Sequence, residues 1–286
     1  MDMRKIIQYD DVIKFQAVVI EHLKRYEAEN NLIIGLLDTL SQNKYHYSDI
    51  EPLLLVIYNE DKLSSVSIMT PPYNIIVSKA ENQDLELLAN YIYERKICIP
   101  GVLGPNREAE VFANYYSDLS SKKFEIEMNE RIYQIDNVES QSMPNGKMRF
   151  ATMNDYVFLK DWARSFAIDA KMSEYDIEKT AERFKKKISD KAVAIWDDGE
   201  PRAMATYQGK TPNGVRIGHV YTPDEFRKNG FGGAVTASLT EYLLNNGNKF
   251  CFLFTDLDNP TSNSIYKKIG YKEVCDFNML KFQTAK

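Results

Sequence analysis

The sequence predicts an α/β (α+β) fold with two domains, each a mixed, mostly antiparallel central sheet flanked by helices. Segments with strand-like alternation and segments with helical spacing of apolar residues follow one another in a similar order in both halves of the chain. With 286 residues, of which 44% are hydrophobic, the chain is long enough for two cores. A polar, turn-rich segment, Glu139 to Gly146, separates the halves, so we expect domains at residues 1–140 and 147–286.

The first half is expected to open with two helices, at Asp10–Glu29 and Leu32–Gln42. Apolar alternation and turn signals then predict a series of strands with two further helices between them. These strands are expected at Leu53–Tyr58, Ser64–Met69, Tyr73–Val77, Ile97–Leu103 and Phe124–Ile135, and the helices at Leu85–Glu94 and Arg107–Leu119.

The second half is expected to begin with a strand and two helices, and Ser173 with Asp176 forms a capping box of the S-x-x-D type at the start of the second helix. Three antiparallel strands and an α-β-α-β series are expected to follow. The strands are expected at Lys147–Ala151, Ala192–Trp196, Pro201–Lys210, Gly214–Thr222, Phe250–Thr255 and Glu273–Phe282, and the other helices at Asp155–Ile168, Gly233–Leu244 and Pro260–Ile269.

A glycine loop links a predicted strand to a predicted helix in the second half. It consists of Arg227-Lys228-Asn229-Gly230-Phe231-Gly232, a pattern of the type [R/Q]-x-x-G-x-[G/A]. Such a turn directs backbone N–H groups and the positive end of a helix dipole to one point, which favours a bound pyrophosphate. No Gly-Lys-[Ser/Thr] follows, so this is not a nucleotide P-loop, and the dinucleotide pattern lacks its first glycine. By itself the loop also fits a simple turn with a helix cap.

A second motif follows the next predicted strand. It is Asn259-Pro260-x-x-Asn263-x-x-Tyr266-x-x-x-Gly270-Tyr271. Asn259 is a good N-cap, Pro260 suits the first helical position, and Gly270 suits the helix end. The helix thus presents Ser262 and Tyr266, four residues apart, near its N-terminus.

The two motifs together resemble those of the GNAT superfamily of N-acetyltransferases. The first combines Val220-Tyr221-Thr222-Pro223 with the glycine loop, and the second is similar to the family pattern N-x-x-[S/A]-x-x-x-Y-x-x-x-G-[F/Y]. The resemblance covers about Arg149 to Met279, roughly half the chain, and implies acetyl-CoA as co-substrate. The residues that it assigns to cofactor binding are Val220, Tyr221, Thr222, Arg227, Lys228, Asn229, Gly230, Phe231, Gly232, Asn259 and Ser262.

Two residues are the predicted catalytic groups. The resemblance assigns Tyr266 as the acid that protonates the leaving thiolate; the alternative is a half-buried packing tyrosine. His219 lies on the strand that leads to the cofactor and is a candidate proton relay, although an isolated histidine in an apolar strand is otherwise structural. Rival candidates for the base are Asp256, Asp258 and Glu174, and Asp258 also fits a turn.

The first half lacks this chemistry. At the position of the glycine loop it has Lys79-Ala80-Glu81-Asn82-Gln83-Asp84, with no glycine and two acidic residues, so it should bind a pyrophosphate poorly. The segment from Gly104 to Arg107 does not match the second motif. We interpret this half as a degenerate acetyltransferase-like domain that completes the acceptor groove or replaces a dimer partner. The alternative is an unrelated α/β domain.

Charge and composition argue against several other functions. A net charge of −5 argues against a general nucleic-acid binder, while the excess of basic residues after Lys147 suits an anionic cofactor. The histidines His22, His46 and His219 lie far apart in the chain, so no metal site is expected. No apolar segment of membrane-spanning length and no export signal occurs, so the expected location is the cytoplasm, without a membrane partner.

The sequence therefore predicts an acyl-CoA-dependent N-acyltransferase. It would transfer acetyl from acetyl-CoA to a primary amine of a small molecule or peptide, as a monomer or homodimer. The alternative is a non-catalytic protein that senses acyl-CoA by binding it. Tyr266 and the two motif glycines favour the enzyme, and the acceptor is not identified by the sequence.

Overall fold

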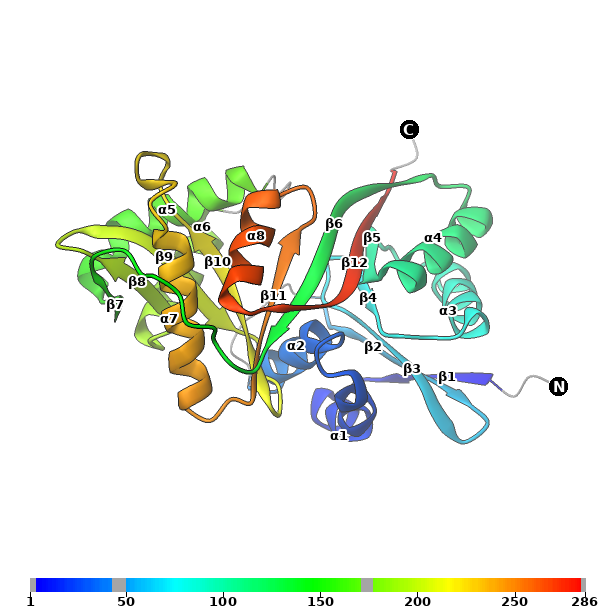
Figure 1. Cartoon of the computed structure of the whole chain (residues 1–286). Helices are drawn as coiled ribbons and strands as arrows, with labels where there is room; N and C mark the ends of the chain where they lie inside the picture. The colour runs from blue at the N-terminus through cyan, green and yellow to red at the C-terminus, as the bar shows by residue number, and fades with distance from the viewer. Residues whose placement is uncertain (1–3, 43–49, 171–176, 284–286) are drawn as a thin grey trace.

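The computed structural model describes residues 4–42, 50–170 and 177–283 (Figure 1). The first half opens with a strand that the sequence pattern did not predict, β1 (Arg4–Tyr9). The other elements of this half are α1 (Val12–Leu23), η1 (Lys24–Tyr26), α2 (Asn31–Ser41), β2 (Leu53–Asn59), β3 (Lys62–Met69), β4 (Ile75–Val77), α3 (Asn82–Glu94), β5 (Gly101–Pro105), α4 (Asn106–Ser120) and β6 (Phe124–Ile135).

The second half follows its predicted order closely, and the fully described elements end within two residues of the predicted positions. They are β7 (Lys147–Phe150), η2 (Met153–Asp155), α5 (Tyr156–Asp169), α6 (Ile177–Ser189), β8 (Val193–Asp197), β9 (Pro201–Gln208), β10 (Gly214–Tyr221), η3 (Asp224–Phe226), α7 (Phe231–Asn245), β11 (Phe250–Asp256), α8 (Pro260–Ile269) and β12 (Lys272–Phe282). The predicted capping box of Ser173 and Asp176 lies outside the described residues.

The first predicted helix is shorter than expected, because α1 ends at Leu23 and continues as the 3-10 turn η1. The side chain of Asn30 donates a hydrogen bond to the carbonyl oxygen of Leu23 at 3.1 Å, which satisfies an acceptor left open at the helix end. β5 also begins later than predicted, at Gly101 rather than Ile97. The residue before this segment, Lys96, has a φ of 54°, where the chain turns after α3.

The strands of the described residues form one sheet, in the order β1-β2-β3-β4-β5-β12-β6-β11-β10-β9-β8-β7. The two halves have the same internal pairing. In each, a series of antiparallel strands ends in one parallel pair, β4 with β5 in the first half and β10 with β11 in the second. The predicted α/β fold, with a mostly antiparallel central sheet flanked by helices, is confirmed.

The two halves exchange their last strands. β6 of the first half lies between β11 and β12, and β12 of the second half lies between β5 and β6, with all three pairings antiparallel. Figure 1 shows this pair of strands crossing the centre of the molecule. Each half therefore completes the sheet of the other half.

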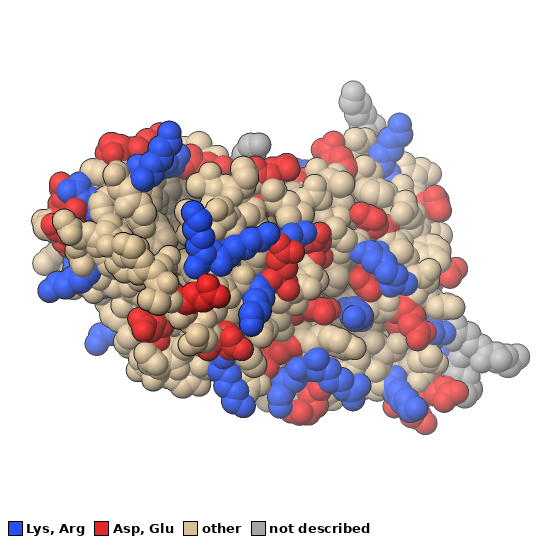
Figure 2. All heavy atoms as spheres, in the orientation of Figure 1, with Lys and Arg blue, Asp and Glu red and all other residues tan. Residues whose placement is uncertain are grey.

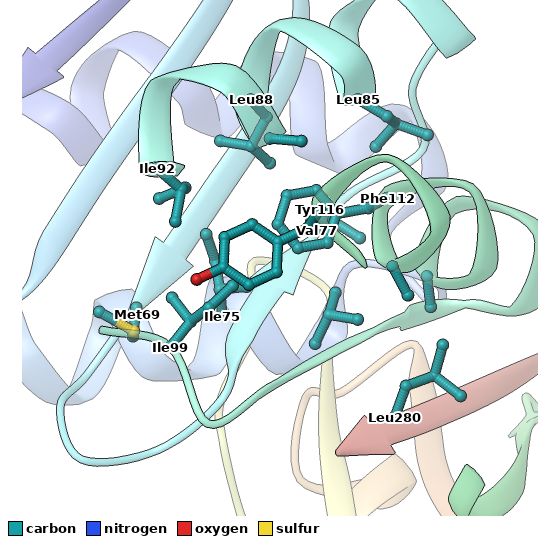
Figure 3. Close-up of a cluster of buried hydrophobic side chains, with 14 of the residues drawn as sticks. Met69, Ile75, Val77, Leu85, Leu88, Ile92, Ile99, Phe112, Tyr116 and Leu280 are labelled. Carbon is teal, nitrogen blue, oxygen red and sulfur yellow. The ribbon is translucent and has the colours of Figure 1, made fainter. Parts of the chain in front are cut away.

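Four apolar clusters fill the space between the sheet and its helices. In the second half, one cluster lies under α7 and α8 and another under α5 and α6, on the opposite face of the sheet. The first half has the same arrangement, with α3 and α4 on one face and α1 and α2 on the other. The exchanged strands contribute to these cores: Leu280 of β12 packs in the cluster under α3 and α4 (Figure 3), and Tyr133 and Ile135 of β6 pack under α7 and α8.

Polar contacts also join the halves, where α2 approaches the turn between β9 and β10. The carboxylate of Glu27 accepts hydrogen bonds from Thr211 Oγ1 at 2.6 Å, Asn213 N at 2.8 Å and Asn213 Nδ2 at 2.7 Å. The backbones of Gly35 and Gly209 are so close that a Cβ on Gly35 would lie 2.7 Å from the Cα of Gly209. A side chain larger than hydrogen at Gly35 would separate the halves at this point.

Candidate active site

The parallel strands β10 and β11 pair only along their first four residues. The register runs from Gly214 opposite Phe250 to Ile217 opposite Leu253. A bulge in β10, between Gly218 and Tyr221, then disturbs its pairing with β9. The backbone of β10 after Ile217 is therefore not paired with β11, and an extended ligand can approach it there.

The glycine loop connects the end of β10 to α7. Lys228 and Gly230 have φ angles of 67° and 82°, so the loop makes two left-handed turns before the helix starts at Phe231. Gly230 is the N-cap residue, no side chain caps the helix, and the first turn carries no acidic residue. The first N–H groups of α7 thus remain available, together with the positive end of the helix dipole.

Arg227 stabilises this loop from outside. Its Nε donates to the carbonyl oxygen of Thr222 at 3.0 Å, and its Nη2 donates to Asp169 Oδ2 at 2.6 Å. Asp224 Oδ1 lies 2.9 Å from the same nitrogen. Asn229 donates from its side chain to the carbonyl oxygens of Phe226 and Arg227, at 3.1 and 3.2 Å. These contacts fix the conformation of the loop, so the side chains of Arg227 and Asn229 both stabilise the loop backbone.

The end of β10, the start of α7 and α8 converge at the motif glycines. A Cβ on Gly232 would lie 3.0 Å from Thr222 Oγ1 and 4.0 Å from Val220 Cγ1. A Cβ on Gly233 would lie 3.4 Å from Ile265 of α8. The structure therefore brings Val220 and Thr222 to the N-terminus of α7, with α8 beside them through Ile265.

The helix α8 is built as its sequence predicts. Asn259 caps it by accepting a hydrogen bond from Ser262 N at 3.1 Å, Pro260 is its first residue, and Gly270 ends it with a φ of 108°. Tyr266 points from this helix into the core and is only 7% exposed. Burial raises the pKa of Tyr266 to about 12, and a hydrogen bond with the Ser262 hydroxyl opposes this shift. The phenol is therefore protonated at neutral pH.

The exchanged strand β6 supports α8 directly, which sequence reasoning missed. The hydroxyl of Tyr133 donates to Asn263 Oδ1 at 3.1 Å, and the rings of Tyr133 and Tyr266 lie 6.5 Å apart. The two residues that form this hydrogen bond are separated by 130 positions. Local periodicity shows that a strand contains Tyr133 but not which helix lies beside it, so the sequence held no usable signal.

His219 lies in the bulge of β10, in a left-handed conformation with a φ of 47°. Its Nδ1 is 3.2 Å from Thr206 Oγ1, and its ring packs against Phe166 and Phe184 with centroids 5.1 and 5.6 Å apart. Burial lowers the pKa of His219 to about 3, and the charges of Lys187 and Arg216 add to this effect. The imidazole is neutral at pH 7 and only weakly basic.

The rival carboxylates are placed differently from one another. Asp256 ends β11, next to the point where β10 and β11 have separated. Its Oδ1 accepts a hydrogen bond from Asp258 N at 2.8 Å, a contact typical of a turn. Asp258 is exposed and lies in this turn before α8. Glu174 lies outside the described residues.

The corresponding helix of the first half, α3, has a closed N-terminus. Glu81 and Asp84 form a reciprocal capping box, and Asp84 is fully buried. The Asp84 carboxylate also accepts hydrogen bonds from Ser64 Oγ at 2.5 Å and Arg4 Nε at 2.9 Å, and Arg4 contacts Glu81 as well. The chain's own carboxylates thus occupy the place that an anionic ligand would take at this helix.

A hollow of about 600 Å³ lies beside α8 and is lined by Arg131, Tyr133, Leu257, Pro260, Asn263, Ser264, Lys267 and Lys268. Its cations are partly neutralised, because Arg131 pairs with Asp276 at 2.5 Å and Lys267 pairs with Glu273 at 2.7 Å. Figure 2 shows basic and acidic side chains together over this part of the molecule. None of the predicted cofactor residues lines the hollow.

Within the described residues, no helix is long and apolar enough to cross a membrane. Over the same ranges, no group of three or more His, Cys, Asp or Glu side chains is arranged to hold a metal ion.

Comparison with known proteins agrees with the predicted resemblance. The family model described as FR47-like protein matches residues 195–279, which run from β8 into β12. None of the curated proteins compared with the sequence matches it.

Several solved structures share the fold over nearly the whole chain. A GCN5-related N-acetyltransferase from Sphaerobacter thermophilus has a TM-score of 0.64 at 13% identity, covering 99% of this chain and 96% of its own. A tandem GNAT protein from the clavulanic acid biosynthesis pathway has a TM-score of 0.57 at 8% identity, covering 99% of both chains. A GNAT acetyltransferase from Colwellia psychrerythraea has a TM-score of 0.57 at 14% identity, covering 98% of this chain and 100% of its own. The family match and the shared fold confirm the resemblance to the GNAT superfamily.

Proposed function

We propose that this chain, a GNAT superfamily member by its FR47-like region and its fold, is an acyl-CoA-dependent N-acyltransferase. The donor is acetyl-CoA, and the acceptor is a primary amine of a small molecule or peptide. The observation that carries the proposal is the uncapped, glycine-lined N-terminus of α7, which faces the separated ends of β10 and β11. Such a terminus binds phosphate groups through backbone N–H groups and the helix dipole.

The cofactor residues that the two motifs predict have the following proposed roles at this terminus. Lys228, Gly230 and Gly232 present backbone to the pyrophosphate, and the close approach of Gly232 to Thr222 leaves no room for a side chain there. The end of β10 that is not paired with β11, Val220 and Tyr221, and the following residue Thr222 hold the extended arm that carries the thioester. Asn259 and Ser262 form the capped start of α8, the helix that approaches Gly233 through Ile265, and would contact the cofactor from there. The loop side chains of Arg227 and Asn229 keep the shape of the loop.

The reaction is a direct transfer. The amine lone pair attacks the thioester carbonyl, and a backbone N–H in the region of Tyr221 and Thr222 stabilises the oxyanion. The C–S bond then breaks, and Tyr266 gives its hydroxyl proton to the leaving thiolate. The raised pKa of Tyr266 suits this role, since an acid must hold its proton until the thiolate forms. Holding both reactants in line supplies roughly 7–11 kcal/mol of the barrier reduction.

His219 is the predicted proton relay on the acceptor side, but its burial weakens it as a proton acceptor. A pKa of about 3 makes its ring a poor proton acceptor at neutral pH. Of the rivals, Asp256 lies at the separated strand end, whereas Asp258 is used by the turn.

The second candidate function is a non-catalytic acyl-CoA sensor. The observation that favours it is the position of Tyr266, which is 7% exposed and packs within the apolar cluster under α7 and α8. In a sensor this tyrosine would only pack, and acyl-CoA would bind without turnover.

Release of free thiol from acetyl-CoA in the presence of a panel of primary amines separates the two. We expect amine-dependent thiol release, with the amine converted to its acetamide. A calorimetric titration with acetyl-CoA should give one site per chain, because α7 has an open N-terminus and the N-terminus of α3 is closed by Glu81 and Asp84. Binding without amine-dependent release would establish the sensor, and two equivalent sites would contradict the assignment of the cofactor to the second half alone.

A further inference from the structure

Arg216 of β10 organises a polar cluster built from both halves of the chain. Its Nη1 donates to Asn31 Oδ1 of α2 at 3.2 Å, and its guanidinium carbon lies 5.6 Å from the ring centroid of Phe254 on β11. Its positive charge lowers the pKa values of Lys187 on α6 and Glu130 on β6. Side chains from β6, β10, β11, α2 and α6 therefore meet around this guanidinium.

Glu130 enters this cluster on the exchanged strand. In the sheet it lies opposite Asp256 of β11 on one side and opposite Phe277 of β12 on the other. Tyr133 and Ile135 of the same strand face the core under α7 and α8. Since side chains alternate along a strand, the side chain of Glu130 lies on the opposite face.

We expect the acceptor to approach from this opposite face, because the proposed cofactor loop lies on the first. The glycine loop, α7 and α8 surround the proposed cofactor site on their own face of the sheet. The pairing of β10 with β11 ends at Ile217 and Leu253, and α5 and α6 cover the other face of this part of the sheet. Asp256, the neighbour of Glu130, is the last residue of β11 at this gap. Glu130 thus lies on the strand next to β11, level with the end of β11 where β10 has already separated from it.

The groups that face Glu130 differ from one side to the other. Arg216 supplies a positive charge from β10 and Asp256 a negative charge from β11, and Phe277 presents an apolar ring from β12. The ring of Phe277 is buried and lies edge-on to Phe254 at 5.4 Å. Lys187 of α6 is close enough for the charge of Arg216 to lower its pKa, and its Nζ donates a hydrogen bond to Gln208 Oε1. The acceptor's ammonium would be attracted to the two carboxylates.

We propose that Glu130 is the proton acceptor for the amine, so that the first half supplies a catalytic residue to the site of the second half. The inference rests on the proposed N-acyltransferase function. It also gives the exchanged strand a chemical role, because Glu130 reaches this site only through the insertion of β6 beside β11.

The proton balance is complete with groups of the chain and water. The acceptor arrives as R–NH3⁺ and gives one proton to the Glu130 carboxylate, which frees the lone pair. The C–N bond forms as the thioester carbonyl becomes an oxyanion, and the nitrogen then loses its second proton to water. As the carbonyl re-forms, the C–S bonding pair leaves on sulfur, and Tyr266 protonates the thiolate. Solvent returns a proton to Tyr266 and removes one from Glu130, so one proton is released per turnover.

The electrostatic surroundings support this role. Burial raises the pKa of Glu130 to about 7, while Arg216 lowers it and Asp256 raises it further. A base with a pKa near the working pH is the most effective in general base catalysis. His219, with a pKa of about 3, is much weaker as a proton acceptor.

The test compares Glu130→Gln with the wild type, using the amine from the panel that gives the fastest thiol release. The wild-type kcat/KM should rise with pH as Glu130 loses its proton and level off near pH 7; this rise and levelling-off is the Glu130 limb of the profile. Glu130→Gln should lower kcat/KM by about 10²–10⁴-fold at pH 7.5 and should not level off near pH 7, because its rate follows only the fraction of free amine. The deficit should shrink as the pH approaches the pKa of the amine, since the free base then needs no proton acceptor. Acetyl-CoA affinity should not change.

Two further variants protect the comparison against a folding artefact. Glu125→Gln changes an exposed carboxylate on the same strand and should keep the wild-type profile. Glu130→Asp keeps a carboxylate, so its kcat/KM should be lower but should still level off once the carboxylate has lost its proton. A purely structural role for Glu130 would not produce this pH dependence. A Glu130→Gln protein with the wild-type limb would overturn the role of Glu130 while leaving the transferase intact. A wild type that binds acetyl-CoA but releases no thiol with any amine would overturn both.

Discussion

The hydroxyl of Tyr133 on the exchanged strand donates a hydrogen bond to Asn263 Oδ1 on α8 at 3.1 Å. Asn263 in turn donates from Nδ2 to the carbonyl oxygens of Asp256 and Asn259, at 2.9 and 2.8 Å. This one amide therefore links the first half to the end of β11 and to the first turn of the helix that carries Tyr266.

Replacement of Tyr133 by Phe removes this link and preserves the ring. We expect a loss of about 0.5–1.5 kcal/mol in the free energy of unfolding, measured in urea, because Asn263 Oδ1 loses its donor. We also expect kcat to fall several-fold with little change in KM for acetyl-CoA, since α8 positions the proposed acid. Tyr93→Phe, at an exposed site on α3, is the control. Unchanged kcat would show that β6 does not position α8 for catalysis.

The glycine loop can be tested at two positions with different physical causes. In Gly232→Ala the new Cβ would lie 3.0 Å from Thr222 Oγ1, and in Gly230→Ala the residue would keep a strained φ of 82°. Either change should weaken acetyl-CoA binding at least about tenfold, or ~1.4 kcal/mol, in calorimetry. Gly199→Ala imposes a similar strain at φ 117° in open space and should leave binding unchanged. Wild-type affinity in Gly232→Ala would disprove the assigned site.

Tyr266→Phe tests the acid. Acetyl-CoA should bind with wild-type affinity while turnover falls by about 10²–10⁴-fold, because the thiolate loses its proton donor. Tyr271→Phe is the matched control, since it removes another buried hydroxyl from the same cluster. This hydroxyl shares a 2.8 Å hydrogen bond with Thr240 Oγ1. That control should lose stability without a comparable loss of turnover. Equal turnover in the two variants would reduce Tyr266 to a packing residue.

The environment of His219 predicts a dependence of stability on pH. The folded protein keeps this side chain neutral down to about pH 3, whereas the unfolded chain takes up a proton near pH 6.5. The stabilisation that the fold gains from a neutral His219 is therefore fully present above pH 6.5. It is lost as the pH falls toward 3, and the loss in the free energy of unfolding is about 2 kcal/mol at pH 5.

His219→Asn removes this titration, and Asn tolerates the left-handed backbone at this position. The loss of thermal stability between pH 7.5 and pH 5 should be smaller in the variant than in the wild type. His22, whose pKa is also lowered by burial, is present in both proteins and cancels in the comparison. Identical pH dependence in the two proteins would show that His219 is not held neutral.

The strand exchange predicts the behaviour of a truncated chain. Residues 147–286 alone lack β6, so β11 and β12 lose the strand between them and the core under α7 and α8 loses Tyr133 and Ile135. We expect this fragment to be insoluble or unable to bind acetyl-CoA, because an open apolar gap with unpaired strand edges remains. Co-expression with residues 1–146 should restore both properties. A soluble fragment 147–286 that binds acetyl-CoA unaided would support two independent domains.

The sequence by itself determined the local structure of the second half. Asn259, Pro260 and Gly270 set the limits of α8, because capping and the left-handed conformation depend on residues that are neighbours in the chain. The glycine loop before α7 follows for the same reason. The edge strand β1 escaped prediction, since half of its short pattern is exposed and only its pairing with β2 defines it.

Only the tertiary structure decided which strand completes the site. Periodicity shows which face of a strand is buried, but its partner strand is chosen by the packing of residues far apart in the chain. The insertion of β6 beside β11 brings Tyr133 to α8 and Glu130 to Asp256, although the first half contains no recognisable motif. The weak basicity of His219 is likewise a tertiary effect, because it arises from burial and from the charges of Lys187 and Arg216 on other elements.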